Sequence, residues 1–474
     1  MENADQTPLS SLRAQTRNLL NDDKTPSCSG DGGCSSAMRT RSGRVVHFGE
    51  ITLPASKSES NRALMIAAYG GFAPDFENLS DSNDTLVLKN TLLSIDALAP
   101  SAVRHYMDSN KVFRHVIPSL PPSKGVPEGR GIKASVSMPK NSPQVIDIAD
   151  CGTAARFLTT YLACHEGDWL LTGTERMKQR PIQPLVNALS VLGADIQYVE
   201  KEGCLPLRIH GKALQGGKVK VDMTQSSQFA SSLLLAAPMF PQGLEMELVG
   251  SPSSLPYLDM TIKMLCRFLA QVKRQGKQVV VRPKPYEKQQ LAIESDWSAA
   301  SYWYEMAAFS EECEIRLLGL NGPSTGSGTL SLQGDIVIAE WMQQLGIGTF
   351  FENDAIVLRK IPFEKHPLTF DFSQHPDLYP TMAATCAGIG VEATFTGLDN
   401  LSVKESDRVE AMQNELAKKG GDSIRFCAHN DHRIVMALAP LSMLVGTVSF
   451  DHPEVVGKSY PNFWDDAAFL PIQR

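Results

Sequence analysis

The fold of this chain is decided by the stretch Pro54-Ala55-Ser56-Lys57-Ser58-Glu59-Ser60-Asn61-Arg62, which runs directly into the small apolar residues 63–68. Serine and asparagine favour helix starts, where the free backbone N–H groups of the first turn can hold an anion. Lys57 and Arg62 add two positive charges, and Ser58 and Arg62, four residues apart, share one face of a helix. We interpret the stretch as a phosphate-binding helix start.

The same pattern of a polar helix start, a helix of small apolar residues, a glycine and a strand occurs six times. The expected helices are 63–68, 154–163, 229–237, 299–308, 379–387 and 434–444. Helices so rich in alanine and serine pack closely against other backbones, so we expect them to be buried on all sides. A second, amphipathic set is expected at 181–192, 258–269, 336–345 and 408–419.

Six repeats divide naturally into two domains of three, and a chain of 474 residues is too long for one core. The sequence therefore predicts an α/β (α+β) protein with two similar domains and buried helices. Three parallel helices in each domain point their positive N-termini at one end, so two facing domains enclose an anion site.

Composition excludes several functions. The net charge of −7 argues against a nucleic-acid binder. The absence of an apolar run long enough to span a bilayer, and of a signal or transit peptide, predicts a cytoplasmic protein that does not enter a membrane. Nine cysteines without C-x-x-C spacing suggest neither a metal site nor a disulfide framework, and are better explained as reduced thiols. No nucleotide-binding glycine motif is found, and no cofactor is expected.

Two segments look irregular. Residues 1–44 are polar and lack periodicity, which is typical of a disordered tail. Residues 100–143 contain several prolines and glycines and are interpreted as an irregular insertion.

Charged side chains gather in the loops before the expected helices. Taken singly, each basic residue is explained by a solvated surface position, but together they favour a cleft for a multiply charged anion. Asp377 and Glu405 lie in the same loops, where each is either a helix cap or an acid or base held among cations. Spacing does not decide between these roles. The basic residues are Lys57, Arg62, Arg156, Arg176, Lys178, Arg180, Lys404, Arg408, Arg433 and Lys458.

The motifs taken together resemble the 5-enolpyruvylshikimate-3-phosphate synthase (3-phosphoshikimate 1-carboxyvinyltransferase) family. The resemblance covers about residues 45–470. It rests on Pro-x-Ser-Lys-Ser-x-Ser-Asn-Arg, Cys-Gly-Thr-Ala-x-Arg, Arg-Met-Lys-x-Arg-Pro-Ile, Ser-Ser-Gln-Phe, Pro-Tyr-x-Asp-x-Thr, Gln-Gly-Asp, Pro-Asp, Val-Lys-Glu-Ser-Asp-Arg, Asn-Asp-His-Arg and Gly-Lys-Ser-x-Pro, which occur here in the family's order.

The resemblance implies two domains, each of three βαβαββ units, joined by two crossover segments, with the active site in the cleft between them. The first domain is expected at 55–294 and the second at 45–54 plus 295–474. The implied reaction moves the enolpyruvyl group of phosphoenolpyruvate to the 5-hydroxyl of shikimate 3-phosphate and releases phosphate, a step towards chorismate and the aromatic amino acids. The implied partners are these two small molecules, and the protein is expected to be a monomer.

The resemblance also implies roles for individual residues. Lys57, Asp377 and Glu405 match catalytic positions: Lys57 as acid or base and phosphate ligand, Asp377 as acceptor of the 5-hydroxyl proton, and Glu405 as the group that serves C3. The implied phosphoenolpyruvate ligands are Lys57, Gly152, Arg176, Gln228, Arg408, Arg433 and Lys458. The implied shikimate 3-phosphate ligands are Ser58, Arg62, Ser226, Ser227, Gln228, Ser254, Tyr257, Asp377, Asn400 and Lys404.

The chain departs from the family pattern at Asp150, where asparagine is usual, and at Ser402, where arginine is usual. Asp150 is expected to put negative charge near the phosphoenolpyruvate site. Two alternatives stay open: the related transfer of enolpyruvyl to UDP-N-acetylglucosamine, and an inactive binding homologue. The Lys-Glu-Ser-Asp-Arg and Ser-Ser-Gln elements favour shikimate 3-phosphate over the first, and the three catalytic matches speak against the second.

Overall fold

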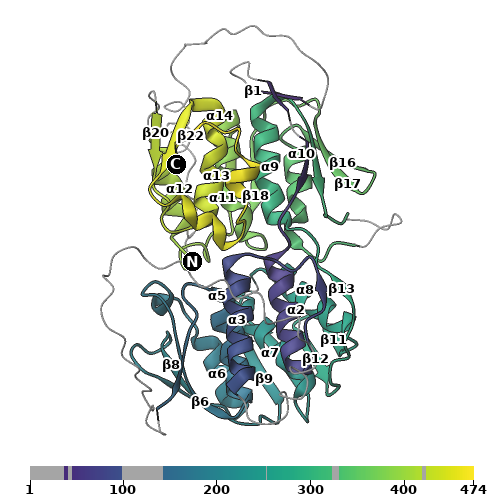
Figure 1. Ribbon diagram of the computed structural model, residues 1–474, viewed down its shortest axis with the longest axis vertical. Helices are drawn as coiled ribbons and strands as arrows, with labels where there is room; N and C mark the ends of the chain where they lie inside the picture. Colours follow the sequence, from purple (N-terminus) through teal and green to yellow (C-terminus); the bar gives the residue numbers. More distant parts are fainter. Residues whose placement is uncertain are drawn as a thin grey trace, which may run out of the picture.

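The computed structural model of the protein has two halves that lie one above the other and are joined by two crossover segments (Figure 1). The structure describes residues 37–40, 45–47, 49–98, 142–251, 253–322, 330–418 and 423–473. The two crossovers run side by side: Ser56 N donates to Glu294 O and Asp296 N donates to Pro54 O, both at 2.8 Å. These paired segments, which also form an isolated β-bridge between Ala55 and Ser295, are where the chain enters and leaves the first half.

The first half consists of helices that pack between three sheets. In chain order its elements are α2 (Lys57–Gly70), β4 (Phe76–Glu77), α3 (Asn83–Leu98), β5 (Gln144–Asp147), α5 (Gly152–Cys164), β6 (Gly167–Thr172), α6 (Gln183–Val191), β7 (Asp195–Tyr198), β8 (Leu207–Gly211), β9 (Gly217–Asp222), α7 (Gln228–Ala236), β10 (Leu244–Val249), α8 (Leu255–Arg267), β11 (Gln271–Gln275), β12 (Gln278–Arg282) and β13 (Leu291–Ala292).

The second half repeats the arrangement and takes strands from the N-terminal side of the first crossover. Its elements are β1 (Ala37–Thr40), β2 (Val45–His47), β3 (Glu50–Thr52), α9 (Trp297–Phe309), β14 (Ser310–Glu312), β15 (Glu314–Leu318), η4 (Gly334–Val337), α10 (Ile338–Gln343), β16 (Ile347–Glu352), β17 (Ala355–Lys360), β18 (Leu368–Asp371), η5 (Pro376–Leu378), α11 (Tyr379–Ile389), β19 (Ala393–Thr396), α12 (Arg408–Leu416), β20 (Ser423–Phe426), α13 (His432–Leu438), α14 (Ser442–Val445), β21 (Thr447–Phe450), η7 (Pro453–Lys458), α15 (Phe463–Asp466) and β22 (Ile472–Gln473).

Two stretches of the first half, 144–211 and 217–282, are complete βαβαββ units. Each unit begins with a parallel pair, β5 with β6 and β9 with β10, and ends with an antiparallel hairpin that joins the same sheet. The sheet β3-β15-β17-β16 in the second half has the same order, with β3 supplying its first strand from across the crossover. The repeated unit confirms the α/β (α+β) prediction.

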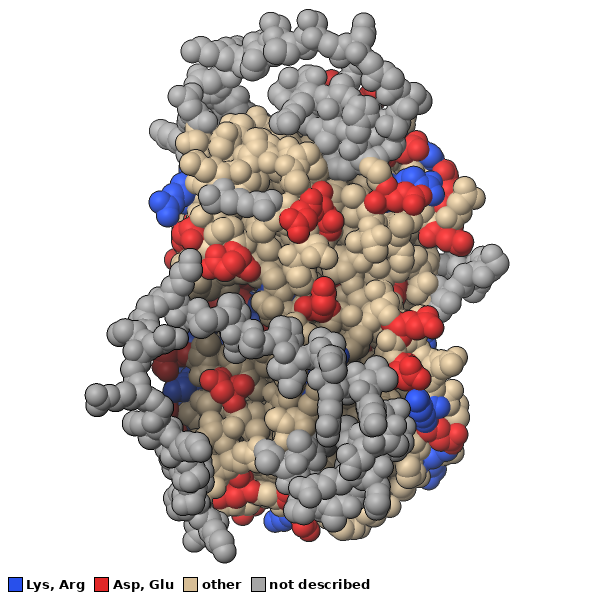
Figure 2. Space-filling model, viewed as in Figure 1, with Lys and Arg blue, Asp and Glu red and all other residues tan. Residues whose placement is uncertain are grey.

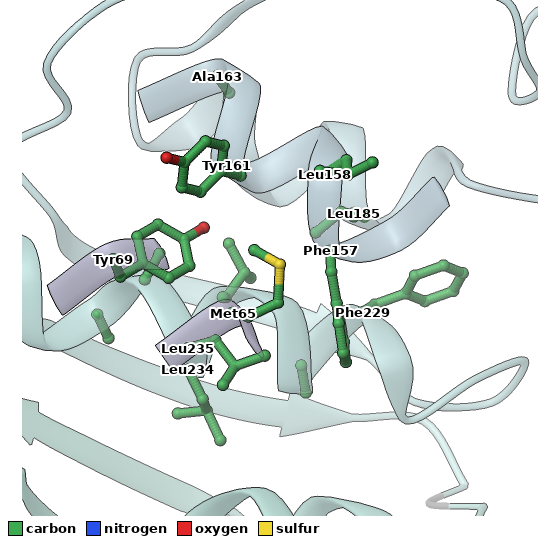
Figure 3. Packing of buried hydrophobic residues seen from close by; sticks show 14 of the residues in the cluster. Met65, Tyr69, Phe157, Leu158, Tyr161, Ala163, Leu185, Phe229, Leu234 and Leu235 are labelled. Atoms are coloured by element: carbon green, nitrogen blue, oxygen red, sulfur yellow. The ribbon is translucent and has the colours of Figure 1, made fainter. Parts of the chain in front are cut away.

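All six predicted small-residue helices form and are buried, but the sixth, predicted at 434–444, is interrupted. A 3-10 turn at Ala439–Leu441 separates α13 from α14, because Pro440 has no N–H to continue the helix. Met65 and Tyr69 of α2, Tyr161 of α5, and Leu234 of α7 meet in the core of the first half (Figure 3). The rings of Tyr69 and Tyr161 lie 5.2 Å apart, which is close enough for a favourable tilted aromatic contact. Alanines and serines on these helices permit the close approach that the sequence predicted.

The buried apolar residues form two separate clusters. One combines Leu53 with residues of 297–470, and the other lies within 55–293 together with Leu332. The division into a domain 55–294 and a domain 45–54 plus 295–474 is the one we propose, and we use the terms first and second domain for these parts.

One part of the predicted tail has a defined structure. Residues 37–40, which the sequence placed in the disordered stretch 1–44, form β1, and β1 pairs with β2 and with β14. Pairing with strands that follow it far along the chain cannot be seen from local composition, so the prediction is wrong at these residues. The other residues of 1–44, and 100–141 of the predicted insertion, lie outside the described residues.

The described surface carries many acidic side chains. On the face seen in Figure 2 they are spread singly, and lysine and arginine show mainly at its edges. Within the described ranges, no helix is both long and apolar enough to cross a membrane.

Candidate active site

The starts of seven helices line one cleft between the domains. Charged and hydroxyl side chains from both domains line this cleft. Helix starts leave backbone N–H groups unpaired and carry partial positive charge, so this arrangement favours an anionic ligand. The contributing helices are α2, α3, α5, α7 and α8 of the first domain and α12 and α13 of the second, and η5, which leads into α11, adds Asp377.

The stretch that begins α2 folds as a capped helix start. Ser56 is the N-cap and accepts a hydrogen bond from Glu59 N, and this places Lys57 and Ser58 in the cleft wall. Arg62 also reaches the wall, but its guanidinium is 2% exposed and already donates to Thr261 Oγ1 at 2.7 Å and to the carbonyls of Ser58 and Tyr257. Arg62 therefore holds the wall together as well as facing the cleft.

Two lysines meet at a buried carboxylate. Asp84, in the first turn of α3, pairs with Lys57 at 3.1 Å and with Lys458 at 3.0 Å. Lys458 comes from η7 of the second domain and also contacts Asp150, whose carboxylate lies 2.8 Å from the ammonium. The two ion pairs of Lys458 cross the domain interface.

Arg408 gathers three carboxylates at the opposite wall. This guanidinium is 1% exposed and donates to Asp377 at 2.8 Å, to Glu405 at 3.0 Å and to Asp431 at 2.8 Å. Arg433 donates to the second oxygen of Asp377 at 2.7 Å. Cations and carboxylates thus alternate along this wall.

The cations control the ionisation of both candidate catalytic acids. Burial alone would raise the pKa of Asp377, but the charges of Arg433, Lys404 and Arg408 hold it well below its usual value. Burial likewise opposes ionisation of Glu405, and the guanidinium groups of Arg180 and Arg408 lower its pKa well below the usual value. Without substrate, both carboxylates are ionised.

Polar groups from the first domain complete the wall near Asp377. The Tyr257 hydroxyl donates to Asp377 at 3.1 Å, and Gln228 donates through its amide to Thr153 Oγ1 at 3.3 Å. Ser254 begins α8 with φ near +57°, and its N–H donates to Ser373 O of the second domain. The predicted residues found in the cleft wall are Lys57, Ser58, Arg62, Gly152, Ser226, Ser227, Gln228, Ser254, Tyr257, Asp377, Lys404, Glu405, Arg408 and Arg433.

Three predicted residues lie outside the cleft lining. Arg176 is turned to the loop before α12, where it donates to the carbonyls of Ser402, Lys404 and Glu405. Asn400 is 5% exposed and does not line the cleft, and Lys458 lies behind Asp84. Their placement as direct ligands is not seen in this structure.

The cleft lining also includes titratable residues to which the resemblance gave no role, among them Arg180, Asp84 and His432. Arg180, which the sequence analysis named only among the basic loop residues, lies 3.5 Å from Glu405 in the cleft wall, whereas Arg176, one turn earlier, does not line the cleft. Asp84 follows the helix-start residues Ser82 and Asn83, a signal that was present in the sequence. His432 lines the cleft with neither ring nitrogen hydrogen-bonded within the described chain, and burial and then Lys57 lower its pKa.

Among the described residues, no group of three or more histidine, cysteine, aspartate or glutamate side chains is placed to hold a metal ion. The cleft offers alternating cations, carboxylates and hydroxyls. Such a site can bind an anion with several charges and move protons at the bound molecule.

Comparisons with known proteins bear on which anion this is. Residues 43–467 match the family model for EPSP synthase (3-phosphoshikimate 1-carboxyvinyltransferase). A protein named 3-phosphoshikimate 1-carboxyvinyltransferase from Bacteroides fragilis is 39% identical over 88% of this chain and 93% of its own length. One of the same name from Mannheimia succiniciproducens is 34% identical over 88% of this chain and 95% of its own length.

Solved structures share the fold. EPSP synthase from Acinetobacter baumannii superposes with a TM-score of 0.61 at 20% identity, covering 92% of this chain and 96% of its own. The enolpyruvyl transferase NikO from Streptomyces tendae superposes with a TM-score of 0.56 at 12% identity, covering 91% and 95%.

Proposed function

The chain belongs to the EPSP synthase (3-phosphoshikimate 1-carboxyvinyltransferase) family, and from this premise we propose how the residues of its cleft carry out the family's reaction. The reaction is the transfer of the enolpyruvyl group of phosphoenolpyruvate to shikimate 3-phosphate, and the chain is an enzyme of the shikimate pathway. The observation that carries our assignment of roles is the alternation of Arg408 and Arg433 with Asp377 and Glu405 at one wall.

The cations bind the substrates. In our proposal Arg408 and Arg433 receive the carboxylate of phosphoenolpyruvate, and Lys57, Gly152, Arg180 and Gln228 receive its phosphate. Guanidinium forks suit carboxylates, and the backbone N–H groups at the start of α5 suit a phosphate. Lys458 joins this set when its contact with Asp150 opens, and Arg176 positions the loop that carries Lys404 and Glu405.

Shikimate 3-phosphate lies on the side of the first domain. Its proposed ligands are hydroxyl and cationic side chains that converge on the cleft from the starts of α2, α7 and α8, together with Lys404 from the loop before α12 of the second domain. Hydroxyl donors and a partly desolvated lysine hold the 3-phosphate and orient the ring, so that the 5-hydroxyl faces Asp377. These ligands are Ser58, Arg62, Ser226, Ser227, Ser254, Tyr257 and Lys404.

Substrate binding prepares Asp377 to act as a base. The incoming carboxylate competes for Arg408 and Arg433, and losing these partners raises the affinity of Asp377 for a proton. Asp377 then takes the 5-hydroxyl proton as the oxygen bonds to C2 of phosphoenolpyruvate and C3 gains a proton. The resulting ketal loses phosphate from C2 and a proton from C3, which restores the double bond.

Glu405 and Lys57 are the proposed groups for proton transfer at C3. Glu405 lies beside Arg180 and Arg408 and suits the removal of the C3 proton as a carboxylate. Lys57, whose ammonium lies 3.1 Å from Asp84, is a proton donor on the facing wall. Domain contacts around the cleft exclude water from the ketal. We also propose that the enzyme acts as a monomer in the cytoplasm.

The acceptor is tested by measuring phosphate release from phosphoenolpyruvate with shikimate 3-phosphate and, separately, with UDP-N-acetylglucosamine. We expect turnover with shikimate 3-phosphate alone. Turnover with only the sugar nucleotide would contradict the assignment, and silence with both would favour an inactive binder. Asp377→Asn tests the base: it is expected to bind shikimate 3-phosphate and to lose about 10²-fold or more in kcat.

A further inference from the structure

The hydroxyl of Tyr257 lies between two carboxylates. Its oxygen is 3.1 Å from Asp377 Oδ2 and 3.3 Å from Asp335 Oδ2. Tyr257 belongs to α8 of the first domain, whereas Asp335 in η4 and Asp377 in η5 belong to the second. A phenol has one proton, so Tyr257 can donate to only one of the two carboxylates at a time.

The two carboxylates have different surroundings. Asp377 lines the cleft and is bound by Arg408 and Arg433. Asp335 is 4% exposed, lies behind Tyr257 outside the cleft lining, and accepts a hydrogen bond from Ser298 Oγ at 2.5 Å. The ring of His375 lies 3.7 Å from its carboxylate, and within the described chain no lysine or arginine forms an ion pair with it.

Proton transfer to Asp377 during the reaction reverses the direction of the hydrogen bond between Asp377 and Tyr257. While Asp377 is ionised it accepts the hydrogen bond of the Tyr257 hydroxyl, as its distance of 3.1 Å, shorter than the 3.3 Å to Asp335, indicates. Once Asp377 has taken a proton from the substrate hydroxyl, it becomes a donor, and the oxygen of Tyr257 is the acceptor within reach. The Tyr257 hydroxyl must then donate its hydrogen bond to another acceptor, and the carboxylate of Asp335 lies within reach.

We propose that Asp335 is a positioning residue for the reaction: by accepting the hydrogen bond of Tyr257, it lets Tyr257 accept one from protonated Asp377. The inference rests on the proposed role of Asp377 as the base. No covalent bond changes at Asp335 or Tyr257, and the substrate proton stays on Asp377 while the two hydrogen bonds change direction together. Asp335 thus favours the protonated form of a base that the surrounding arginines otherwise keep ionised.

Other charged groups face the two carboxylates and remain in place when Asp335 is changed. The charged groups that interact with Asp377 are those of Arg433, Lys404, Arg408 and Glu405. The charge of Asp335 interacts with those of Arg433 and Asp296, and its carboxylate also contacts Ser298 and His375. The direct effect of the Asp335 charge on these groups does not need the Tyr257 hydroxyl, so comparing Asp335→Asn with and without that hydroxyl isolates the path through Tyr257.

The test is the pH dependence of kcat for Asp335→Asn with both substrates saturating. Asparagine keeps the size and an acceptor oxygen but loses the charge, so Tyr257 stays turned to Asp377 and stabilises its ionised form. We expect kcat to fall about tenfold, a part of what a general base contributes. The acid limb of the profile should move to lower pH, and the KM for shikimate 3-phosphate should stay within about twofold, since Asp335 does not line the cleft.

Glu415→Gln is the matched control. Glu415 is also a buried carboxylate of the second domain, 3% exposed, but it pairs with Lys418 and His429 away from the cleft. It should leave the acid limb where it is. A profile for Asp335→Asn whose acid limb does not move would overturn the proposal, even if kcat falls, because simple damage to the fold lowers kcat without moving the limb.

A double-mutant cycle provides a second test that does not depend on the stability of one variant. In a Tyr257→Phe background the hydroxyl is gone, so Asp335→Asn should move the acid limb by less than half as much. An equal shift in both backgrounds would contradict transmission through Tyr257. Asp377→Asn tests the role of Asp377 separately from that of Asp335. If this variant turns over normally, Asp377 is not the base. If it loses turnover but Tyr257 and Asp335 show no coupling, only the inference about Asp335 is refuted.

Discussion

Replacing Asp150 by asparagine should tighten the binding of phosphoenolpyruvate, because Asp150 competes with the substrate for Lys458. A lysine ammonium has three N–H donors. In this structure they meet Asp84 Oδ1 at 3.0 Å, Asp150 Oδ2 at 2.8 Å and the carbonyl oxygen of Asp150 at 3.0 Å. An arriving phosphate must displace one of them, and the Asp150 side chain, 53% exposed, is the easiest to release into water.

The size of the effect follows from distance and exposure. Two unit charges 2.8 Å apart attract by about 6 kcal/mol at an effective dielectric constant of about 20. Half of the Asp150 side chain is in water, however, and exposed ion pairs contribute about 1 kcal/mol or less. About 1 kcal/mol corresponds to a KM for phosphoenolpyruvate about fivefold lower in Asp150→Asn.

The assay is steady-state phosphate release at saturating shikimate 3-phosphate, with phosphoenolpyruvate varied at low and at high salt. The gain should shrink at high salt, because salt screens a half-exposed charge. Glu200→Gln is the matched control, since Glu200 is an exposed acid 3.3 Å from Lys178 and does not line the cleft. A KM that is unchanged or higher in Asp150→Asn would refute the competition.

Three further predictions concern buried acids and the domain interface. Burial and then the charge of Glu294 raise the pKa of Glu59 to about 8. The native state therefore keeps a proton that the unfolded chain releases above about pH 4.5, and the free energy of unfolding should fall by up to about 5 kcal/mol as pH rises from 4.5 to 8. Denaturant unfolding of Glu59→Gln should lack most of this loss, and a wild-type pH dependence in the variant would contradict it. Glu305 is fully buried, and neither of its carboxylate oxygens has a hydrogen-bond partner among the described residues. Glu305→Met should therefore raise the free energy of unfolding by about 1–3 kcal/mol and move the denaturant midpoint up. A lower midpoint would show that the carboxyl group has a role we have missed. Arg176→Ala removes the donors to three carbonyls of the loop 402–405 and should raise the KM for phosphoenolpyruvate about tenfold at nearly unchanged melting temperature, whereas an unchanged KM would exclude a positioning role.

Local chemistry explains which parts of the structure the sequence predicts. Serine, asparagine and aspartate before runs of alanine mark helix starts, and α2 begins at Lys57 where that pattern indicated. The small residues also predicted that these helices are buried, because only small side chains permit close packing on all sides. Each of these properties depends on neighbours in the chain.

Contacts between distant segments explain what was missed. Arg176 and Arg180 lie one turn apart in the same motif, and only the position of the loop carrying Glu405 decides that Arg180 faces the cleft. Lys458 was expected to bind substrate, but Asp84 and Asp150 reach it from the other domain. The strand β1 forms because β14 offers it a partner more than half the chain away.

The most direct test of the account is Glu405→Gln, measured for binding of both substrates by calorimetry and for phosphate release. Glutamine keeps the shape of Glu405 beside Arg180 and Arg408 but cannot exchange a proton at C3. We predict dissociation constants within a few-fold of wild type and a kcat lower by about 10²-fold or more. Turnover at the wild-type rate would leave Glu405 with only its ion pairs to Arg180 and Arg408 and would contradict the assignment of the catalytic groups.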